Sequence, residues 1–274
     1  MRLIAPLLLV ALSVSPADQN PGGLSFTATL DSIKISGRPG QVVTRQFRLT
    51  LDPNQPRTQF KAHVDDWWRS EDGKQSFYAE GGTLRRSCAR WVSLNPRESA
   101  VSAGDTLVVR LSISIPREIR PGGYWCALTV DEVPDPLADA PGVGVRFAAS
   151  VSTGIFVNLD PIERAATITA LQVSPNEALV RVRNDGNTPL AVDGHLDFLA
   201  PGSKTPAATA ALPRGTILTE PILEGTLSTP LPAPDVLPSG HYLVRAILDF
   251  GADHFIGAER EIDIVRAVGN VPIR

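Results

Sequence analysis

The amino-acid sequence predicts an all-β protein with two immunoglobulin-like β-sandwich domains in tandem. Helical periodicity is nearly absent, and the chain instead contains short segments in which apolar and polar residues alternate. Its 22 glycines and 24 prolines lie between these segments and mark turns. Because a domain usually holds about 100–150 residues, a chain of 274 residues favours two domains over one.

The first 17 residues have the pattern of a secretory signal peptide. Arg2 gives a short basic start, a mostly apolar stretch follows from Leu3 to Val14, and Ser15-Pro16-Ala17 places small residues at a cleavage site. The apolar stretch is shorter than the roughly 20 residues that cross a bilayer. We therefore expect cleavage near Ala17, a periplasmic or secreted protein, and no membrane span in the mature chain.

We expect the first domain to cover residues 18–160. Its clearest strand runs from Leu107 to Ile115, where every second residue is apolar. The same kind of alternation predicts strands at Val43–Leu51, Phe60–Val64, Tyr124–Val130 and Val143–Val157. The last of these places five apolar residues on one face: Val145, Phe147, Ala149, Val151 and Ile155.

Asp160-Pro161 precedes a second domain, which we expect to cover residues 161–274. Alternation predicts its strands at Thr167–Val173, Ala178–Arg183, Val192–Leu199, Gly225–Leu231, Tyr242–Phe250 and Phe255–Ile264. The two domains echo one another, since a turn and an aromatic residue precede an apolar strand ending in Asp131 in one and in Asp249 in the other. Tyr124 and Tyr242 begin these strands, as the corner tyrosine of immunoglobulin-like folds does.

The two cysteines, Cys88 and Cys126, are too few for a four-cysteine zinc site or a disulfide-dense scaffold. In an exported protein they are candidates for one disulfide bond. The alternative is a pair of buried free thiols.

The sequence lacks the patterns of common enzymes and metal sites. It contains no nucleophile elbow, no His-Glu-x-x-His and no phosphate-binding glycine loop. The net charge of −3 and the absence of a basic cluster argue against nucleic-acid binding. The carboxylate pairs Asp65-Asp66 and Asp131-Glu132 are adjacent on strands, so their side chains point to opposite faces. We therefore expect no enzymatic activity, no metal and no small-molecule cofactor.

Trp67-Trp68 allows two interpretations. Strand alternation would bury one indole in the core and let the other cover an edge. Alternatively, the pair forms an aromatic contact surface for glycan or protein. The second interpretation belongs to an alternative function, a structural or adhesive surface module.

The segment from Gly122 to Pro134 resembles strand F and the following loop of periplasmic pilus-assembly chaperones (PapD-like). The run Val143–Val157 is similar to strand G of that family, and Asn95–Ile115 is similar to the segment leading into strand E. The second half, around Asn184–Leu190, looks like bacterial immunoglobulin-like modules.

The resemblance implies a chaperone-like protein that binds a secreted or pilin-like polypeptide by β-strand pairing. The residues of strand G that it implies as donors are Val143, Val145, Phe147, Ala149 and Val151. An ordinary strand of the sandwich would show the same alternation. Members of the family also anchor the carboxyl terminus of the bound subunit with two basic residues. Here the first strand offers Lys34, and Val151–Gly154 of strand G carries no cation.

Overall fold

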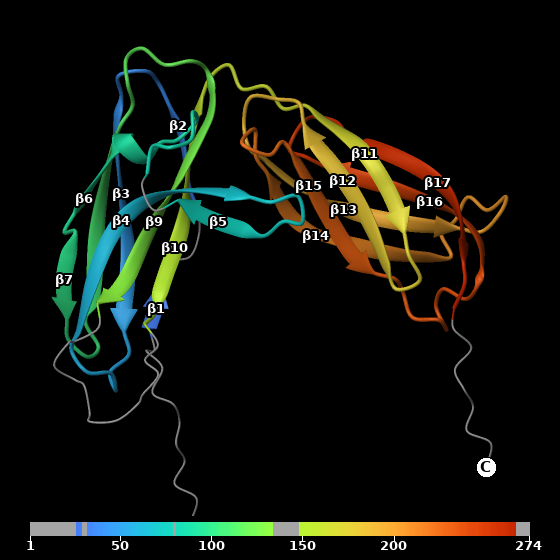
Figure 1. The fold of residues 1–274 in the computed structure, drawn as a ribbon, viewed down its shortest axis with the longest axis horizontal. Coiled ribbons are helices and arrows are strands. Elements are labelled where there is room, and N and C mark those ends of the chain that lie inside the picture. Colours follow the sequence, from blue (N-terminus) through green and yellow to red (C-terminus); the bar gives the residue numbers. More distant parts are fainter. Residues whose placement is uncertain (1–25, 29–31, 79–80, 134–147, 267–274) are drawn as a thin grey trace, which may run out of the picture.

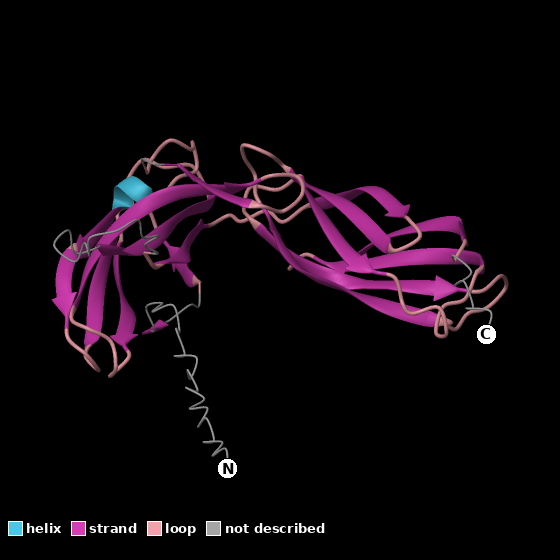
Figure 2. Ribbon diagram, turned by 60° about the horizontal axis from the view of Figure 1, so that its bottom comes forward, coloured by secondary structure: helices cyan, strands magenta, loops and turns pink. Residues whose placement is uncertain are grey.

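The computed structural model describes residues 26–28, 32–78, 81–133 and 148–266. The proposed signal peptide and the predicted donor residues Val143, Val145 and Phe147 lie outside these ranges. The described chain is all-β, as predicted, and forms two β-sandwiches whose long axes are set at an angle (Figure 1). The one helix of the described chain is the single turn η1 (Ala89–Trp91) (Figure 2). No described helix has the length and apolar character needed to cross a membrane.

The N-terminal sandwich consists of two sheets built from the first ten strands. One sheet has the order β1 (Phe26–Ala28), β3 (Val42–Leu51), β8 (Thr106–Ser114), β6 (Val92–Asn95). The other has the order β2 (Ile33–Gly37), β10 (Ser150–Leu159), β9 (Gly122–Val133), β4 (Thr58–Arg69), β5 (Gln75–Tyr78), with β7 (Glu98–Val101) also paired to β4. Among the described strands of this sandwich, β2 and β10 pair in parallel and the others antiparallel.

Alternation explains most of these strands. In β8, Leu107, Val109, Leu111 and Ile113 point into the core, while Arg110 is exposed between them. Strand β9 differs, because every residue from Gly122 to Val130 is buried. Its second face is covered by an apolar cluster that includes Leu218 of the C-terminal sandwich. A strand that is covered on both faces has a nearly continuous apolar sequence.

The C-terminal sandwich also consists of two sheets. One has the order β11 (Ala166–Val173), β12 (Glu177–Asn184), β15 (Glu224–Pro230), and the other has the order β14 (Ala208–Ile217), β13 (Leu190–Leu199), β16 (Gly240–Asp249), β17 (Ile256–Ile264). Side chains such as Val180, Phe198 and Val244 are fully buried between the sheets.

Both sandwiches contain the tyrosine corner that the internal echo suggested. The Tyr124 hydroxyl donates to the carbonyl oxygen of Arg120 at 2.9 Å. The Tyr242 hydroxyl donates to the carbonyl oxygen of Pro238 at 3.1 Å. In each case the acceptor lies four residues earlier, so each phenol fixes the turn that leads into its strand.

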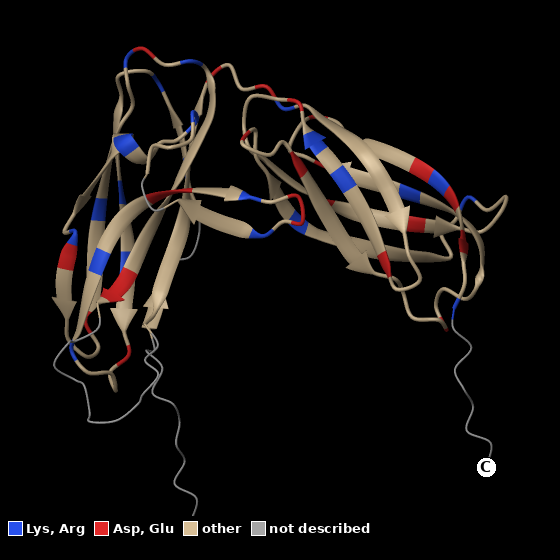
Figure 3. Ribbon diagram, in the orientation of Figure 1, with Lys and Arg blue, Asp and Glu red and all other residues tan. Residues whose placement is uncertain are grey.

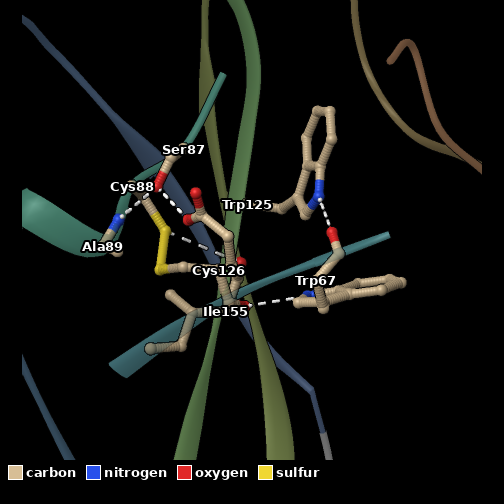
Figure 4. Close-up of a disulfide and its surroundings, with 8 residues drawn as sticks. Trp67, Ser87, Cys88, Ala89, Trp125, Cys126 and Ile155 are labelled. Atoms are coloured by element: carbon tan, nitrogen blue, oxygen red, sulfur yellow. Dashed lines mark hydrogen bonds between the residues drawn. A yellow bond between two sulfur atoms is a disulfide. The ribbon is translucent and has the colours of Figure 1, made fainter. Parts of the chain in front are cut away.

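A disulfide joins Cys88 to Cys126, which is the first of the two alternatives that the sequence left open (Figure 4). Both cysteines are fully buried. The backbone N–H of Cys88 also donates to the carbonyl oxygen of Trp125 at 3.1 Å. The bond therefore fastens the segment before η1 to the middle of β9.

Candidate functional site: the open edge of β10 and the adjoining cleft

Strand β10 is paired along its whole length on one side and only in part on the other. Antiparallel pairing with β9 extends from Ser150 to Leu159. Parallel pairing with β2 begins at Ile155, opposite Ile33. Within the described residues, no strand runs beside Ser150–Ser152 on the β2 side. We call Ser150–Ser152 the open edge.

The backbone of Ser150 and Ser152 points toward this open side. The carbonyl oxygen of Ala149 accepts a hydrogen bond from the N–H of Glu132 at 2.8 Å, so the backbone groups of Ala149 face β9. Lateral directions alternate along a strand, which turns the N–H and C=O of Ser150 and Ser152 away from β9. An extended segment in that position would find two donors and two acceptors in register.

The strands β1 and β2 each form an edge of their own sheet in the N-terminal sandwich. Ala28 ends β1 and Ile33 begins β2, and at about 3.6 Å per extended residue these two edges lie within about 18 Å of each other. Three apolar side chains on this side of the sandwich, Phe26, Ala28 and Val151, are only half-buried against the core. This side therefore presents both backbone groups and apolar surface.

Of the five predicted donor residues, two lie in the described chain. Ala149 is half-buried and immediately precedes β10, and Val151 is half-buried within it, on the same face as the buried residues Ile155 and Val157. Strand β10 begins at Ser150 and ends at Leu159, two residues beyond the end of the predicted strand.

A polar network lies on the outer face of the sheet beside the open edge. His63 on β4 bridges two carboxylates: its Nδ1 is 2.8 Å from Oδ1 of Asp65, and its Nε2 is 2.7 Å from Oδ2 of Asp131. The other oxygen of Asp131 accepts a hydrogen bond from the Ser150 hydroxyl at 2.6 Å. Partial burial opposes the charge on the imidazole, but the hydrogen bonds to Asp131 and Asp65 outweigh it and raise the pKa of His63 above its usual 6.5.

A second branch of this network also reaches the open edge. The Thr129 hydroxyl donates to Oδ2 of Asp65 at 2.7 Å and lies 2.9 Å from the Ser152 hydroxyl. Because the Thr129 proton is used on Asp65, Ser152 is the donor in the second bond. Both serines of the open edge are thus linked through β9 to His63.

A cleft of about 500 Å³ separates the two sandwiches at the far end of β10. The N-terminal sandwich lines it with Lys34 of β2 and with Phe156 and Asn158 of β10. The C-terminal sandwich contributes Arg164 and Arg214, and Arg214 is paired with Asp193 at 3.6 Å. Neither Lys34 nor Arg164 forms an ion pair with any residue in the described part of the chain.

The predicted shortage of basic residues therefore applies to β10 itself but not to the cleft. Lys34, the one basic residue that the sequence offered on the first strand, lines this cleft. The further cations, Arg164 and Arg214, come from the C-terminal sandwich, and a search confined to the first domain could not find them. Charged residues are otherwise spread over both sandwiches (Figure 3).

Trp67 and Trp68 have different surroundings. Trp67 is 3% exposed, and its indole N–H donates to the carbonyl oxygen of Cys126 at 3.1 Å (Figure 4). It packs edge-on against Phe156 in the apolar cluster that reaches Leu218. Trp68 is half-buried beside Tyr78. Trp67 is thus buried, in a cluster that includes Leu218 and not in the core of the N-terminal sandwich, and is not accessible to a ligand.

The adjacent carboxylates point in opposite directions, as predicted. Asp65 belongs to the His63 network, whereas Asp66 accepts the N–H groups of Thr83 at 2.5 Å and Leu84 at 2.8 Å, and the Ser87 hydroxyl. In the second pair, Asp131 also joins the network, while Glu132 accepts the N–H of Ala149 at 3.0 Å. None of the described residues form a group of three or more suited to holding a metal ion.

The comparisons with known proteins concern the whole chain. No protein-family model matches it, and no curated protein matches it. A solved chaperone–tip adhesin complex of CFA/I fimbriae is similar with a TM-score of 0.49 and 12% identity, over 89% of this chain and 100% of that one. The YadV chaperone has a TM-score of 0.45 and 16% identity, over 86% and 99% of the two chains. The Pseudomonas aeruginosa CupB2 chaperone has a TM-score of 0.44 and 12% identity, over 87% and 100%. At identities this low, the likeness carries no assignment of function.

Proposed function

We propose that this protein is an exported, non-enzymatic chaperone-like protein that binds a secreted, pilin-type polypeptide by strand addition at the open edge of β10. The observation that carries the proposal is the partial pairing of β10, which leaves Ser150–Ser152 without a neighbouring strand in the described chain. Strand addition uses main-chain hydrogen bonds for affinity and pockets for alternate side chains for specificity.

The open edge offers the main-chain groups, and half-buried apolar side chains lie on the same side of the sandwich. Ser150 and Ser152 present outward N–H and C=O groups to an incoming strand. Every second side chain of that strand would point toward the core, in the direction of Phe26, Ala28 and Val151. A polypeptide with alternating apolar residues suits this edge, because its apolar side chains would cover surface that the sandwich leaves half-exposed.

The cleft suits the end of such a polypeptide. A strand beside Ser150–Ser152 must stop where β2 begins, at Ile33, which is next to Lys34 in the chain. A terminal carboxylate there would meet Lys34 from one sandwich, with Arg164 of the other across the cleft. Charge-assisted hydrogen bonds to such a carboxylate would fix the register of the bound strand.

Site-specific photo-crosslinking in the exporting cell tests the proposal. A photoreactive residue replaces Ser150 in the full-length chain, and the same residue replaces Glu261 on β17, an exposed edge strand of the C-terminal sandwich, as the control. We expect the Ser150 probe, and not the Glu261 probe, to capture a secreted polypeptide through a segment with alternating apolar residues. Equal capture at both positions, or capture at neither, would overturn the proposal.

A further inference from the structure

We infer that His63 is a pH-dependent clamp that, when protonated, holds the open edge of β10 against the sheet and, when neutral, releases it. The clamp is a property of the N-terminal sandwich alone. Its consequence for polypeptide binding rests on the proposed function.

The geometry around His63 favours the charged imidazole. Both ring nitrogens face carboxylate oxygens, at 2.8 Å and 2.7 Å. An imidazolium donates from both nitrogens and satisfies both carboxylates, whereas a neutral imidazole keeps one lone pair. Loss of the proton therefore turns one of these two hydrogen bonds into a repulsive contact, and Asp65 or Asp131 must move.

Movement of either carboxylate would disturb hydrogen bonds that hold β10. Asp131 holds the Ser150 hydroxyl, and Asp65 holds Thr129, which in turn holds Ser152. These two serines make up the part of β10 that has no described strand on its other side. Besides the pairing with β9, the hydroxyl hydrogen bonds of Ser150 and Ser152 on the outer face therefore contribute much of the order of this segment.

The other charges around His63 come from three strands. Asp65 lies on its own strand β4, and Asp131 lies on β9. Lys61 of β4 is paired with Glu98 of β7 at 3.8 Å, and the two share a cavity with His63 and Arg97. Lys61 and Glu98 balance one another, and Arg97 in the same cavity adds a positive charge that opposes protonation of the ring. The two aspartates are the carboxylates that contact the ring. The contributions from β10 are the uncharged hydroxyls of Ser150 and Ser152.

The protonation state of His63 sets how the order of β10 changes with pH. Below the pKa of His63 the network is complete and the start of β10 is held in register with β9. Above that pKa the tethers weaken and the segment separates more often from β9. A strand edge held in its binding conformation binds more tightly than a disordered one, so we expect polypeptide capture to weaken as the pH rises through the pKa of His63.

Hydrogen exchange of the Val151 amide tests the clamp without any partner. This amide points toward β9, because lateral directions alternate from Ala149, and its exchange therefore reports separation of the two strands. In the full exported chain, corrected for the intrinsic pH dependence of exchange, we expect its protection factor to fall about tenfold as His63 loses its proton. That factor corresponds to about one charge-assisted hydrogen bond.

Three variants, one of them a control, and one titration complete the experiment. His63→Gln should abolish the pH-dependent step, and Asp131→Asn should move its midpoint to lower pH together with the pKa of His63 measured by NMR. His241→Gln is the matched control, because His241 also contacts a carboxylate, Asp263, at 2.8 Å but lies in the C-terminal sandwich. A Val151 protection factor that is independent of pH, or a step that persists in His63→Gln, would overturn the clamp. The exchange experiment contains no bound polypeptide. Its result therefore tests the clamp even if the proposed strand addition proves wrong.

Discussion

The backbone N–H of Arg86, in the N-terminal sandwich, donates a hydrogen bond to Oε1 of Glu220, in the C-terminal sandwich, at 2.6 Å. The Glu220 side chain is 11% exposed, so this contact is largely shielded from water. Together with the apolar cluster of Trp67, Trp125 and Leu218, it joins the two sandwiches. Their junction thus includes a buried carboxylate that accepts a backbone donor.

Replacing Glu220 with Ala should weaken this junction. The variant leaves the N–H of Arg86 without its acceptor, and we expect a loss of about 1–3 kcal/mol in the free energy of unfolding, measured by denaturant titration. Arg85→Ala is the matched control. Arg85 contacts the same carboxylate at 3.2 Å, but its side chain is 91% exposed, so we expect a change below about 0.5 kcal/mol. Equal losses in the two variants would contradict this account of the junction.

Asp66→Asn should be costly for a related reason. Asp66 is fully buried and accepts two backbone N–H groups and one hydroxyl from the segment that carries Arg86. An amide places its own N–H donors against some of these donors, and we expect a loss of about 1–3 kcal/mol in the free energy of unfolding. The exposed Asp72→Asn on the neighbouring turn provides the comparison, and a similar loss there would argue against a special role for Asp66.

The two tyrosine corners should contribute equally and independently. Tyr124→Phe and Tyr242→Phe each keep the ring and remove one hydrogen bond, so each should cost about 1 kcal/mol of unfolding free energy. Because the two residues lie in different sandwiches, the double variant should show the sum of the two losses. A double variant far from that sum would show that the corners are coupled.

Stability should depend on pH through His63. The pKa of His63 is raised in the folded chain, so its contribution to stability is fully present below the unfolded pKa of about 6.5 and disappears as the pH rises through the higher folded value. The difference in unfolding free energy between the wild type and His63→Gln should therefore be largest in mildly acidic buffer and smallest in alkaline buffer. A difference that grows with rising pH would have the wrong sign for a bridged imidazolium.

Alternation along the chain was enough to predict most of the strands. The apolar series from Leu107 to Ile115 became β8, and the residues that it placed inside are buried. Strand β14 was missed, because its sequence is rich in alanine and contains Pro213. The structure accommodates this proline where the pairing of β13 and β14 shifts register, between Val192 and Gly194.

The site was harder to predict, because its parts meet only after folding. His63 and Asp131 are 68 residues apart, and only the pairing of β4 with β9 brings them together. Arg164 faces the same cleft as Lys34 because the two sandwiches are set at an angle. The second face of β9 is buried because the C-terminal sandwich covers it, and alternation within one domain contains no information about that cover.

Ser152 offers the most direct test of strand addition. Its N–H points to the open side, so Ser152→Pro removes a donor that an added strand would use without removing a hydrogen bond to β9. Ser152→Ala is the matched control, because it lacks the same hydroxyl but keeps the N–H. With the photoreactive residue at Ser150 in the exporting cell, both variants lack the two serine hydroxyls, so their comparison isolates the N–H of residue 152. We expect the Pro variant to give at most about a tenth of the crosslinked product of the Ala variant, as loss of one buried hydrogen bond implies. Equal crosslinking by both variants, with both chains folded by circular dichroism, would contradict binding through the main chain of β10.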